Sequence, residues 1–265
     1  DMDLVEQYVN HDPAVKGIWC VPKYSNPTGI TYSDEVVRRM ASLKPAAADF
    51  RIYWDNAYAL HHLYDDVQDA IPEILSECAK AGNPDMVYEF CSTSKISFPG
   101  GGVAVLVSSK ANLEDIRAQL TIQTIGHDKL NQLRHVRYFK NAQGVMDHMK
   151  KHADFMRPKF ETVLTVLEKE LGGLGIGSWV RPRGGYFISF DAMPGCAKEI
   201  VDMAKDAGLV LTGAGATYPY GKDPQDSNIR IAPTYPTPQE LELAGDIFVL
   251  SVKLVSLKKI LEKRA

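Results

Sequence analysis

One lysine stands at the mouth of a turn between two apolar runs, and its surroundings suggest a chemical role. The apolar stretch at residues 88–94 ends in small hydroxyl side chains, and Lys95 follows it directly. A glycine-rich turn at 99–102 leads into a second apolar run at 103–107, a pattern typical of strand, turn and strand. An unprotonated lysine amine is the nucleophile that forms Schiff bases with carbonyl compounds. Most lysines are simply exposed, so Lys95 alone does not establish a site.

Two further apolar segments end in polar side chains where a strand is expected to stop. The first, at 17–21, is followed by Asn26 in the sequence Asn-Pro-Thr-Gly, and the second, at 50–54, is followed by Asp55 and Tyr58. In open α/β sheets, ligands bind outside the carboxyl ends of the strands. We therefore expect an amide, a carboxylate, a phenol and the lysine amine to line one crevice.

These four groups suit pyridoxal phosphate. Asp55 is the candidate that keeps the pyridine nitrogen protonated, so that the ring can act as an electron sink. Tyr58 and Asn26 can donate hydrogen bonds to the phenolic oxygen of the ring. Lys95 would form the Schiff base with the cofactor and then move a proton from the substrate Cα.

The order and spacing of the motifs resemble those of the fold-type I pyridoxal-phosphate aminotransferases of class I/II. The shared motifs are Asn26-Pro-Thr-Gly, Asp55-x-x-Tyr58, Ser92-x-Ser-Lys95 and Asn228-Ile-Arg230-Ile-Ala232. Each motif alone is weak, but the four in this order are specific. The chain is most similar to the aspartate aminotransferase branch, which also resembles the aminotransferase domain of MocR-type regulators. The resemblance covers nearly the whole chain.

The resemblance implies roles for further residues. Arg230 matches the arginine that binds the substrate α-carboxylate, since guanidinium geometry suits a carboxylate in a bidentate way, and Asn26 shares in substrate binding. Ser92 matches a hydroxyl that binds the cofactor phosphate, and Ser97 is a further candidate for that role. The resemblance also implies a homodimer of the complete protein and small-molecule partners, an amino acid and a 2-oxo acid. Nucleic acid, membrane and metal are not expected as partners.

The chain departs from the family pattern in two places. Family members carry a substantial segment ahead of the Asn-Pro-Thr-Gly strand, with a phosphate-binding loop at a helix N-terminus, whereas Asp1 lies a short way before that strand. We therefore expect the chain to be the C-terminal part of a longer enzyme, inactive without its N-terminal segment. Gly101 and Gly102 occupy the stretch where most relatives place a phosphate-binding arginine. The pattern does not settle how this chain would bind the cofactor phosphate.

Composition places the chain among ordinary globular proteins. Its 265 residues are 45% hydrophobic and 24% charged, which leaves room for one large domain or two modest ones. A net charge of −3 argues against a broad nucleic-acid or anionic-membrane surface. No apolar run approaches the ~18 residues of a membrane span. The cysteines lack metal-binding or redox spacing, so we expect a cytoplasmic protein in which Cys20 and Cys91 are buried in strands.

The hydrophobic periodicity predicts an α/β fold with a large domain and a smaller α+β domain. Residues 1–142 are expected to form the cofactor-binding large domain, with a mostly parallel sheet. Its predicted strands are 17–21, 50–54, 86–91 and 103–108, and its predicted helices are 33–43, 70–81, 110–123 and 128–140. The last two strands should be antiparallel, because too few residues separate them for a helical crossover.

Residues 143–265 are expected to form the smaller domain, including a long connecting helix at 143–171 that Pro158 kinks or interrupts. The other predicted elements are strands at 178–182, 185–190, 209–211 and 229–232 and helices at 195–207 and 238–263. The polar loop at 213–226 is long enough to suggest a function. We expect it to line the substrate entrance.

The predicted reaction is the reversible transfer of an amino group between an amino acid and a 2-oxo acid. By resemblance, the substrates are aspartate or another dicarboxylic amino acid and 2-oxoglutarate. Three alternatives stay open: another pyridoxal-phosphate reaction such as a lyase or decarboxylase, the effector-sensing half of a MocR-type transcription regulator, and a remnant that cannot hold the cofactor. A lyase would not depend on a 2-oxo acid, and a regulator would need a helix-turn-helix segment.

Overall fold

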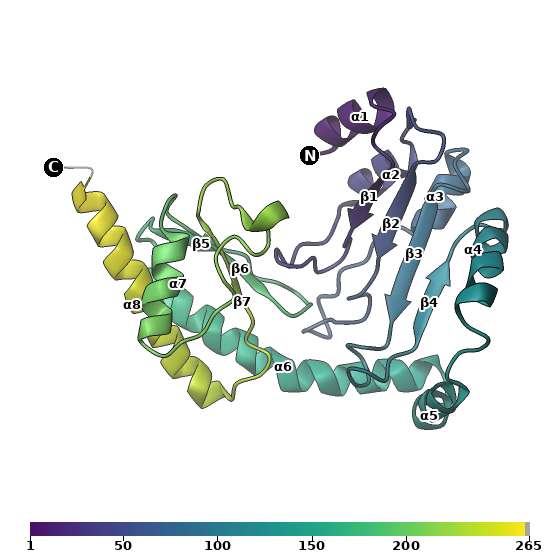
Figure 1. Cartoon of the computed structure of the whole chain (residues 1–265). Helices are drawn as coiled ribbons and strands as arrows, with labels where there is room; N and C mark the ends of the chain where they lie inside the picture. Colours follow the sequence, from purple (N-terminus) through teal and green to yellow (C-terminus); the bar gives the residue numbers. More distant parts are fainter. Residues whose placement is uncertain (263–265) are drawn as a thin grey trace. The chain divides into compact units, whose positions relative to one another are not determined.

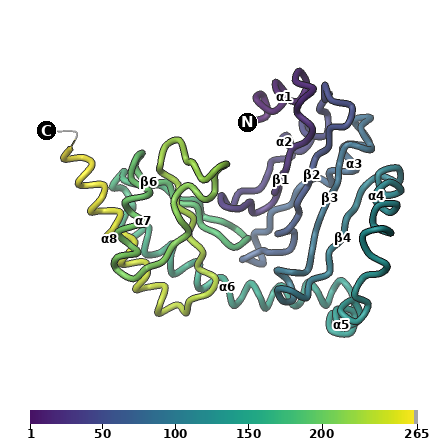
Figure 2. The backbone as a smooth tube through the Cα atoms, in the orientation of Figure 1, coloured from purple at the N-terminus to yellow at the C-terminus, as the bar shows by residue number. Residues whose placement is uncertain are grey.

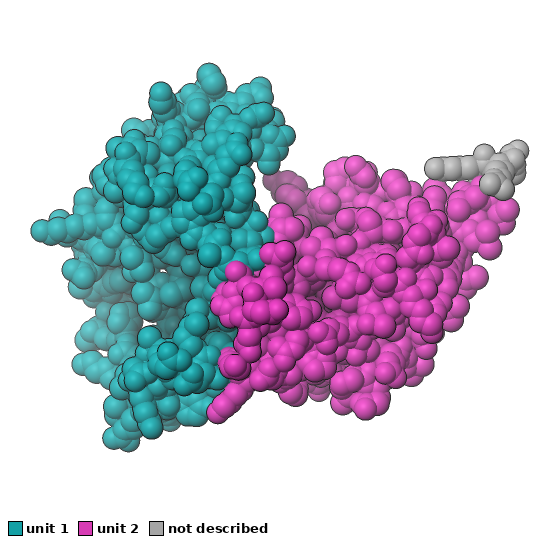
Figure 3. All heavy atoms as spheres, turned by 180° about the vertical axis from the view of Figure 1, so that it is seen from behind, with its two compact units in different colours: residues 1–23, 31–60, 69–149 teal, residues 24–30, 61–68, 150–265 magenta. Residues whose placement is uncertain are grey.

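The computed structural model describes residues 1–262, which form two compact units. Unit 1 comprises residues 1–23, 31–60 and 69–149, and unit 2 comprises residues 24–30 and 61–68 and the chain from Lys150 onward, as the two colours of Figure 3 show. Two short segments of the N-terminal half thus belong to unit 2. The expected division into domains 1–142 and 143–265 stays a prediction.

Unit 1 is built around a mostly parallel four-stranded sheet (Figure 1). Its strands lie in the order β1 (Gly17–Cys20), β2 (Arg51–Asp55), β3 (Val87–Ser92) and β4 (Ala104–Val107). The first three are parallel and β4 is antiparallel to β3. The α/β fold class, the four strands and the reversal before β4 are therefore confirmed.

The helices of unit 1 connect and flank these strands. They are α1 (Met2–His11), α2 (Asp34–Ala41), α3 (Ile74–Lys80), α4 (Lys110–Gln123), α5 (Lys129–Phe139) and the first turns of α6 (Ala142–Leu171). The side chain of Ser33 accepts a hydrogen bond from the Val36 amide and so caps the N-terminus of α2. The sequence pattern does not predict α1. Its buried residues are Met2 and Val9, and two apolar positions are too few to define a helical hydrophobic period.

The two faces of the unit 1 sheet differ in what covers them. On one face, buried residues such as Ile52, Trp54 and Val87 form a core with α1, α2 and α3. The other face carries stacked aromatic rings, with the Trp19 and Tyr53 ring centres 5.7 Å apart. Cys91, expected to be buried, is exposed, because the core cluster includes Val87 but does not reach the C-terminal half of β3.

Unit 2 contains a three-stranded antiparallel sheet packed against helices. The strands are β5 (Gly177–Trp179), β6 (Ile188–Ala192) and β7 (Asn228–Ile231), and the helices are the rest of α6, α7 (Ala197–Asp206) and α8 (Pro238–Glu262). Apolar side chains of all three helices and of β6 and β7 share one core. The backbone trace shows α7 and α8 side by side (Figure 2).

Two expected features of unit 2 are absent from residues 1–262: an interruption of α6 at Pro158 and a strand at 209–211. Pro158 does not interrupt α6, which continues from Ala142 to Leu171; the proline ring is exposed, and the buried side chains on either side of it keep the helix on the core. Residues 209–211 form no strand, because Val210 is 78% exposed and β7 pairs with β6 alone. Within residues 1–262, none of the helices has both the length and the apolar character needed to cross a bilayer.

Candidate functional site

Lys95 lies in a tight turn that follows β3. The amides of Ile96 and Ser97 both donate to the carbonyl of Thr93, at 2.9 and 2.8 Å. Lys95 is exposed, and its Nζ lies 5.2 Å from the centre of the Tyr58 ring. Unit 1 therefore brings together the amine and the phenol that the sequence pattern singles out.

Asp55 and Ser92 end two neighbouring parallel strands. Asp55 is paired with Phe90 in the register of β2 and β3, so Asp55, Phe90 and Ser92 fall on the same face of the sheet. This is the face that carries the stacked aromatic rings. A carboxylate and a hydroxyl are thus presented at the carboxyl ends of the strands, where ligands bind in α/β proteins.

This set of side chains in unit 1 fits pyridoxal phosphate. Lys95 supplies an amine for the aldehyde, and Asp55 supplies a carboxylate for the pyridine N–H. The Tyr58 hydroxyl can donate to the phenolic oxygen, and the Ser92 hydroxyl to the phosphate. Each functional group of the cofactor therefore has a partner of suitable chemistry.

Glu89 of β3 is paired with Trp54, so it lies on the opposite face of the sheet from Asp55, and the sequence analysis did not single it out. Asn56 Nδ2 donates to Glu89 Oε1 at 3.0 Å. Burial raises the pKa of Glu89, and the hydrogen bond from Asn56 opposes that effect only in part. The sequence did contain a sign of this residue, because Glu89 interrupts the apolar run of β3. A charged residue in a predicted buried strand is expected to have a hydrogen-bond or ion-pair partner.

Close packing explains why glycine stands at position 102. A Cβ atom there would lie 2.3 Å from Ser94 Oγ and 2.9 Å from the Ser94 backbone nitrogen. Any side chain would therefore displace the turn that carries Lys95. The departure from the family pattern at Gly102 follows from this local packing.

Arg230 of β7 is held by three neighbours within unit 2. Its Nη1 donates to Asn26 Oδ1 at 3.0 Å and its Nη2 to Thr212 Oγ1 at 3.2 Å. The guanidinium carbon lies 4.5 Å from the centre of the Phe187 ring, within the range of a cation–π interaction. Arg230 Nε is buried and has no hydrogen-bond partner among residues 1–262. A guanidinium with unused donors is suited to a carboxylate ligand.

The Asn-Pro-Thr-Gly motif places Asn26 beside Arg230. The Asn26–Pro27 peptide bond is cis, and the Gly29 amide donates to the carbonyl of Ser25 at 2.6 Å. Gly29 has φ +69°, and a Cβ atom there would lie 2.8 Å from the Cβ of Pro182. Glycine is therefore required to close this turn. Sequence reasoning missed Phe187 and Thr212, because neither belongs to a motif with a recognisable spacing.

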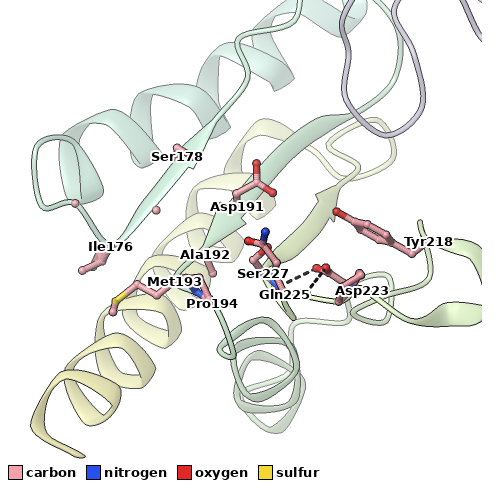
Figure 4. A pocket seen from close by; sticks show the side chains of 13 residues that line it. Ile176, Ser178, Asp191, Ala192, Met193, Pro194, Tyr218, Asp223, Gln225 and Ser227 are labelled. Carbon is pink, nitrogen blue, oxygen red and sulfur yellow. Dashed lines mark hydrogen bonds between the residues drawn. The ribbon is translucent and has the colours of Figure 1, made fainter. Parts of the chain in front are cut away.

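A polar pocket of about 630 Å³ lies in unit 2 between β6 and the loop at 213–226 (Figure 4). Asp223 and Asp191 are among its lining residues. Burial acts to raise the pKa of Asp223, but backbone N–H donors outweigh it and the pKa is lowered. Those donors include the amides of Ser227 and Asn228, both at 2.8 Å.

The second carboxylate of this pocket is also engaged, since Asp191 Oδ1 accepts from Asn228 Nδ2 at 2.8 Å. Both aspartates therefore fix the start of the strand that carries Arg230. We assign the pocket this structural role, and the expected substrate entrance at 213–226 stays a prediction.

The chain matches known proteins over nearly its whole length. A sequence profile of the aspartate amino-transferase family matches residues 1–264. An aspartate aminotransferase from Corynebacterium glutamicum is 46% identical over 246 residues, which are 93% of this chain and 56% of that protein. The crystal structure of an aspartate transaminase from Corynebacterium glutamicum superposes with a TM-score of 0.95 at 44% identity, covering 98% of this chain and 61% of that one.

A more distant structure shares the fold. The α-aminoadipate aminotransferase from Thermus thermophilus, solved with N-(5′-phosphopyridoxyl)-L-leucine, has a TM-score of 0.78 at 18% identity, over 96% of this chain and 63% of that one. The chain spans a little over half the length of the curated relatives that it matches. The family profile and the closely similar relatives agree, and the chain belongs to the aspartate aminotransferase family.

Proposed function

We propose that this protein is a pyridoxal-phosphate-dependent aminotransferase that moves an amino group between an amino acid and a 2-oxo acid. Membership in the family implies the cofactor and the class of reaction. The observation that carries the proposal is the position of Lys95 Nζ, 5.2 Å from the centre of the Tyr58 phenol ring. A lysine and a phenol close together at the carboxyl ends of the strands are the groups that this chemistry needs.

Each residue of unit 1 has a distinct role in the proposal. When bound, pyridoxal phosphate supplies an aldehyde for the amino group and an electron sink for the substrate Cα. Lys95 would hold the cofactor through that aldehyde, and its amine would be the base for the proton at the substrate Cα. Asp55 holds the proton on the pyridine nitrogen. Tyr58 donates to the phenolic oxygen, and Ser92 donates to the phosphate.

Arg230 carries the proposed recognition of the substrate. Its guanidinium, supported by Asn26, binds the α-carboxylate of the amino acid. The names of the similar proteins favour aspartate as the donor. Another dicarboxylic amino acid as the donor and 2-oxoglutarate as the acceptor follow from the sequence resemblance alone. A homodimer and a cytoplasmic location belong to the same proposal and rest on the resemblance alone.

An assay of paired products tests the proposal. The purified protein is incubated with pyridoxal phosphate, aspartate and 2-oxoglutarate, and oxaloacetate and glutamate are measured over time. We expect the two products in equal amounts and neither without 2-oxoglutarate. Consumption of aspartate that is independent of 2-oxoglutarate would instead indicate a lyase or decarboxylase, and Lys95→Ala is the matched negative control.

A further inference from the structure

Two histidines that have no role in the proposed reaction hold the turn that carries Lys95. His135 lies on α5 and His148 on the first turns of α6, and both belong to unit 1. His135 Nε2 lies 2.9 Å from Thr93 Oγ1 and 2.8 Å from Ser97 Oγ. These hydroxyls belong to the residues two positions before and two positions after Lys95.

The hydrogen-bond partners of His135 define the role of each ring nitrogen. Its Nδ1 lies 2.8 Å from the carbonyl oxygen of Asn131, which can only accept, so Nδ1 carries the hydrogen and Nε2 of the neutral ring is an acceptor. Thr93 Oγ1 accepts from the Val103 amide at 2.8 Å, which leaves its own hydrogen for His135. The Ser97 hydroxyl also lies 3.0 Å from the carbonyl oxygen of Thr93, so its one hydrogen is shared between two acceptors. The ring therefore ties Thr93 to α5 and contacts Ser97 at the other end of the turn.

His148 holds the middle of the same turn. Its Nε2 lies 2.8 Å from the carbonyl oxygen of Ile96, the residue directly after Lys95, and must donate to it. The Tyr138 hydroxyl lies 3.3 Å from His148 Nδ1. The Phe139 ring packs against both histidines, with ring centres 5.9 Å from His135 and 5.4 Å from His148.

The far end of the loop, at Gly101, is attached to α5. Asn131 Nδ2 donates to the carbonyl of Gly101 at 2.6 Å, and Asn131 is itself buried. The loop from Thr93 to Gly102 is thus fixed at several backbone and hydroxyl groups, while the Lys95 side chain itself is exposed. Such an arrangement restrains the main chain and leaves the reactive side chain accessible.

We infer that His135 and His148 are positioning residues for Lys95, a role that rests on the proposed aminotransferase function. Proton transfer requires the amine within hydrogen-bond reach of the substrate Cα, and a misplacement of about 1 Å can cost roughly 100-fold in rate. The turn's own two backbone hydrogen bonds both end on the Thr93 carbonyl and leave the rest of its main chain to be held by other groups. The two rings restrain it through Thr93, Ile96 and Ser97.

Three variants of the cofactor-loaded protein test the inference. His135→Leu removes the acceptor, and His135→Gln restores an oxygen near the position of Nε2. His11→Leu is the matched control, since His11 lies on α1 and its Nδ1 makes the same contact to a carbonyl four residues back, Gln7 at 2.9 Å. The amino-acid half-reaction gives kcat and KM, and amide hydrogen exchange reports the order of the loop.

For His135→Leu we expect kcat to fall at least about tenfold with KM changed less than about twofold. Exchange at Ile96, Ser97 and Val103 should be at least about tenfold faster, and the visible band of the bound cofactor should remain. His135→Gln should recover most of kcat, and His11→Leu should match the wild type.

Two results would overturn the inference. One is a wild-type kcat in His135→Leu with unchanged exchange in the loop. The other is a parallel loss of kcat, substrate binding and cofactor band that Gln does not relieve, which would mark His135 as a general packing residue. If the wild type itself shows neither a band nor amino transfer, it is the proposed function that fails.

Discussion

Lys95 in unit 1 and Arg230 in unit 2 are both cations with a proposed role toward the substrate, but different parts of the two residues are restrained. At Lys95 the turn is held through its backbone and neighbouring hydroxyls, by His135 and His148, and the amine of the exposed side chain lies beside the Tyr58 ring. At Arg230 the contacts fall on the guanidinium itself, through Asn26, Thr212 and the Phe187 ring.

This difference corresponds to the two tasks. A residue that binds an aldehyde and then carries a proton must move its amine, so only its main chain can be held rigidly. A residue that binds a carboxylate throughout the reaction gains from a fixed head group, because a preorganised fork loses less entropy on binding. Substitutions at the two residues should therefore have different kinetic signatures.

The largest effect is expected from substitution of Lys95. Lys95→Ala should lower kcat by about 1000-fold or more and remove the visible band of the bound cofactor, since both the amine for the aldehyde and the base are lost. Absorption spectra and steady-state rates measure this. Lys44→Ala, at an exposed lysine in the same unit, should change neither; a normal band in Lys95→Ala would remove the residue from the site.

Substitution of Arg230 should weaken the binding of the amino-acid substrate. Arg230→Ala should raise the KM of the amino acid and lower kcat/KM by more than tenfold, equal to about 1.4 kcal/mol. The cofactor band should persist, because Arg230 is assigned to the substrate. Steady-state kinetics with Arg117→Ala as the control, at an exposed arginine of α4, provide the check. An unchanged KM would contradict the assignment.

The aromatic support of Arg230 should have a smaller effect of the same kind. Phe187→Leu keeps most of the apolar volume but removes the ring face beneath the guanidinium, a cation–π interaction of about 1 kcal/mol. We expect KM to rise about threefold to tenfold. Phe155→Leu is a matched control, because Phe155 has a different cation at the same distance, Lys159 Nζ at 4.5 Å. Equal kinetics in both variants would mean that the Phe187 ring does not support the guanidinium.

The smallest effect concerns the stability of unit 1 at Glu89. Burial raises the pKa of Glu89 in the folded state, so its contribution to stability is present below the unfolded pKa of about 4.3 and is lost as pH rises through the folded pKa. Glu89→Gln keeps an oxygen for Asn56 and removes the charge. Its Tm at pH 7 should exceed that of the wild type by on the order of 1–3 °C.

A series of melting curves from pH 4 to pH 7 measures this difference, which should vanish toward pH 4. Glu114→Gln, at an exposed carboxylate of α4, is the control. A lower Tm for Glu89→Gln at pH 7 would show that the carboxylate is needed in its charged form.

Much of the fold could be predicted, because the spacing of hydrophobic residues and the presence of turn residues determine secondary structure locally. The strands of unit 1 and the reversal before β4 follow from short apolar runs and from the glycine-rich turn at 99–102. The local rule failed at Pro158, where packing on both sides kept α6 continuous. It failed again at 209–211, where an apolar triplet has no neighbouring strand to pair with.

The candidate site was predictable to the extent that motifs mark it. Asn26, Asp55, Tyr58, Ser92, Lys95 and Arg230 each lie in a motif, and the contacts between Lys95 and Tyr58 and between Asn26 and Arg230 agree with those motifs. Thr212, Phe187 and His135 could not be identified in this way. Their contacts join residues 18 and 42 positions apart, as for Thr212 with Arg230 and Thr93 with His135, and only the folded chain reveals such pairs.

The central claim is that Lys95 is the residue that binds the cofactor, and chemical mapping tests it most directly. The protein is loaded with pyridoxal phosphate, reduced with borohydride, digested and analysed by mass spectrometry. We expect the phosphopyridoxyl mass on the peptide that contains Lys95, at close to one group per chain. The same mass on a different lysine, with Lys95 unmodified, would contradict the account.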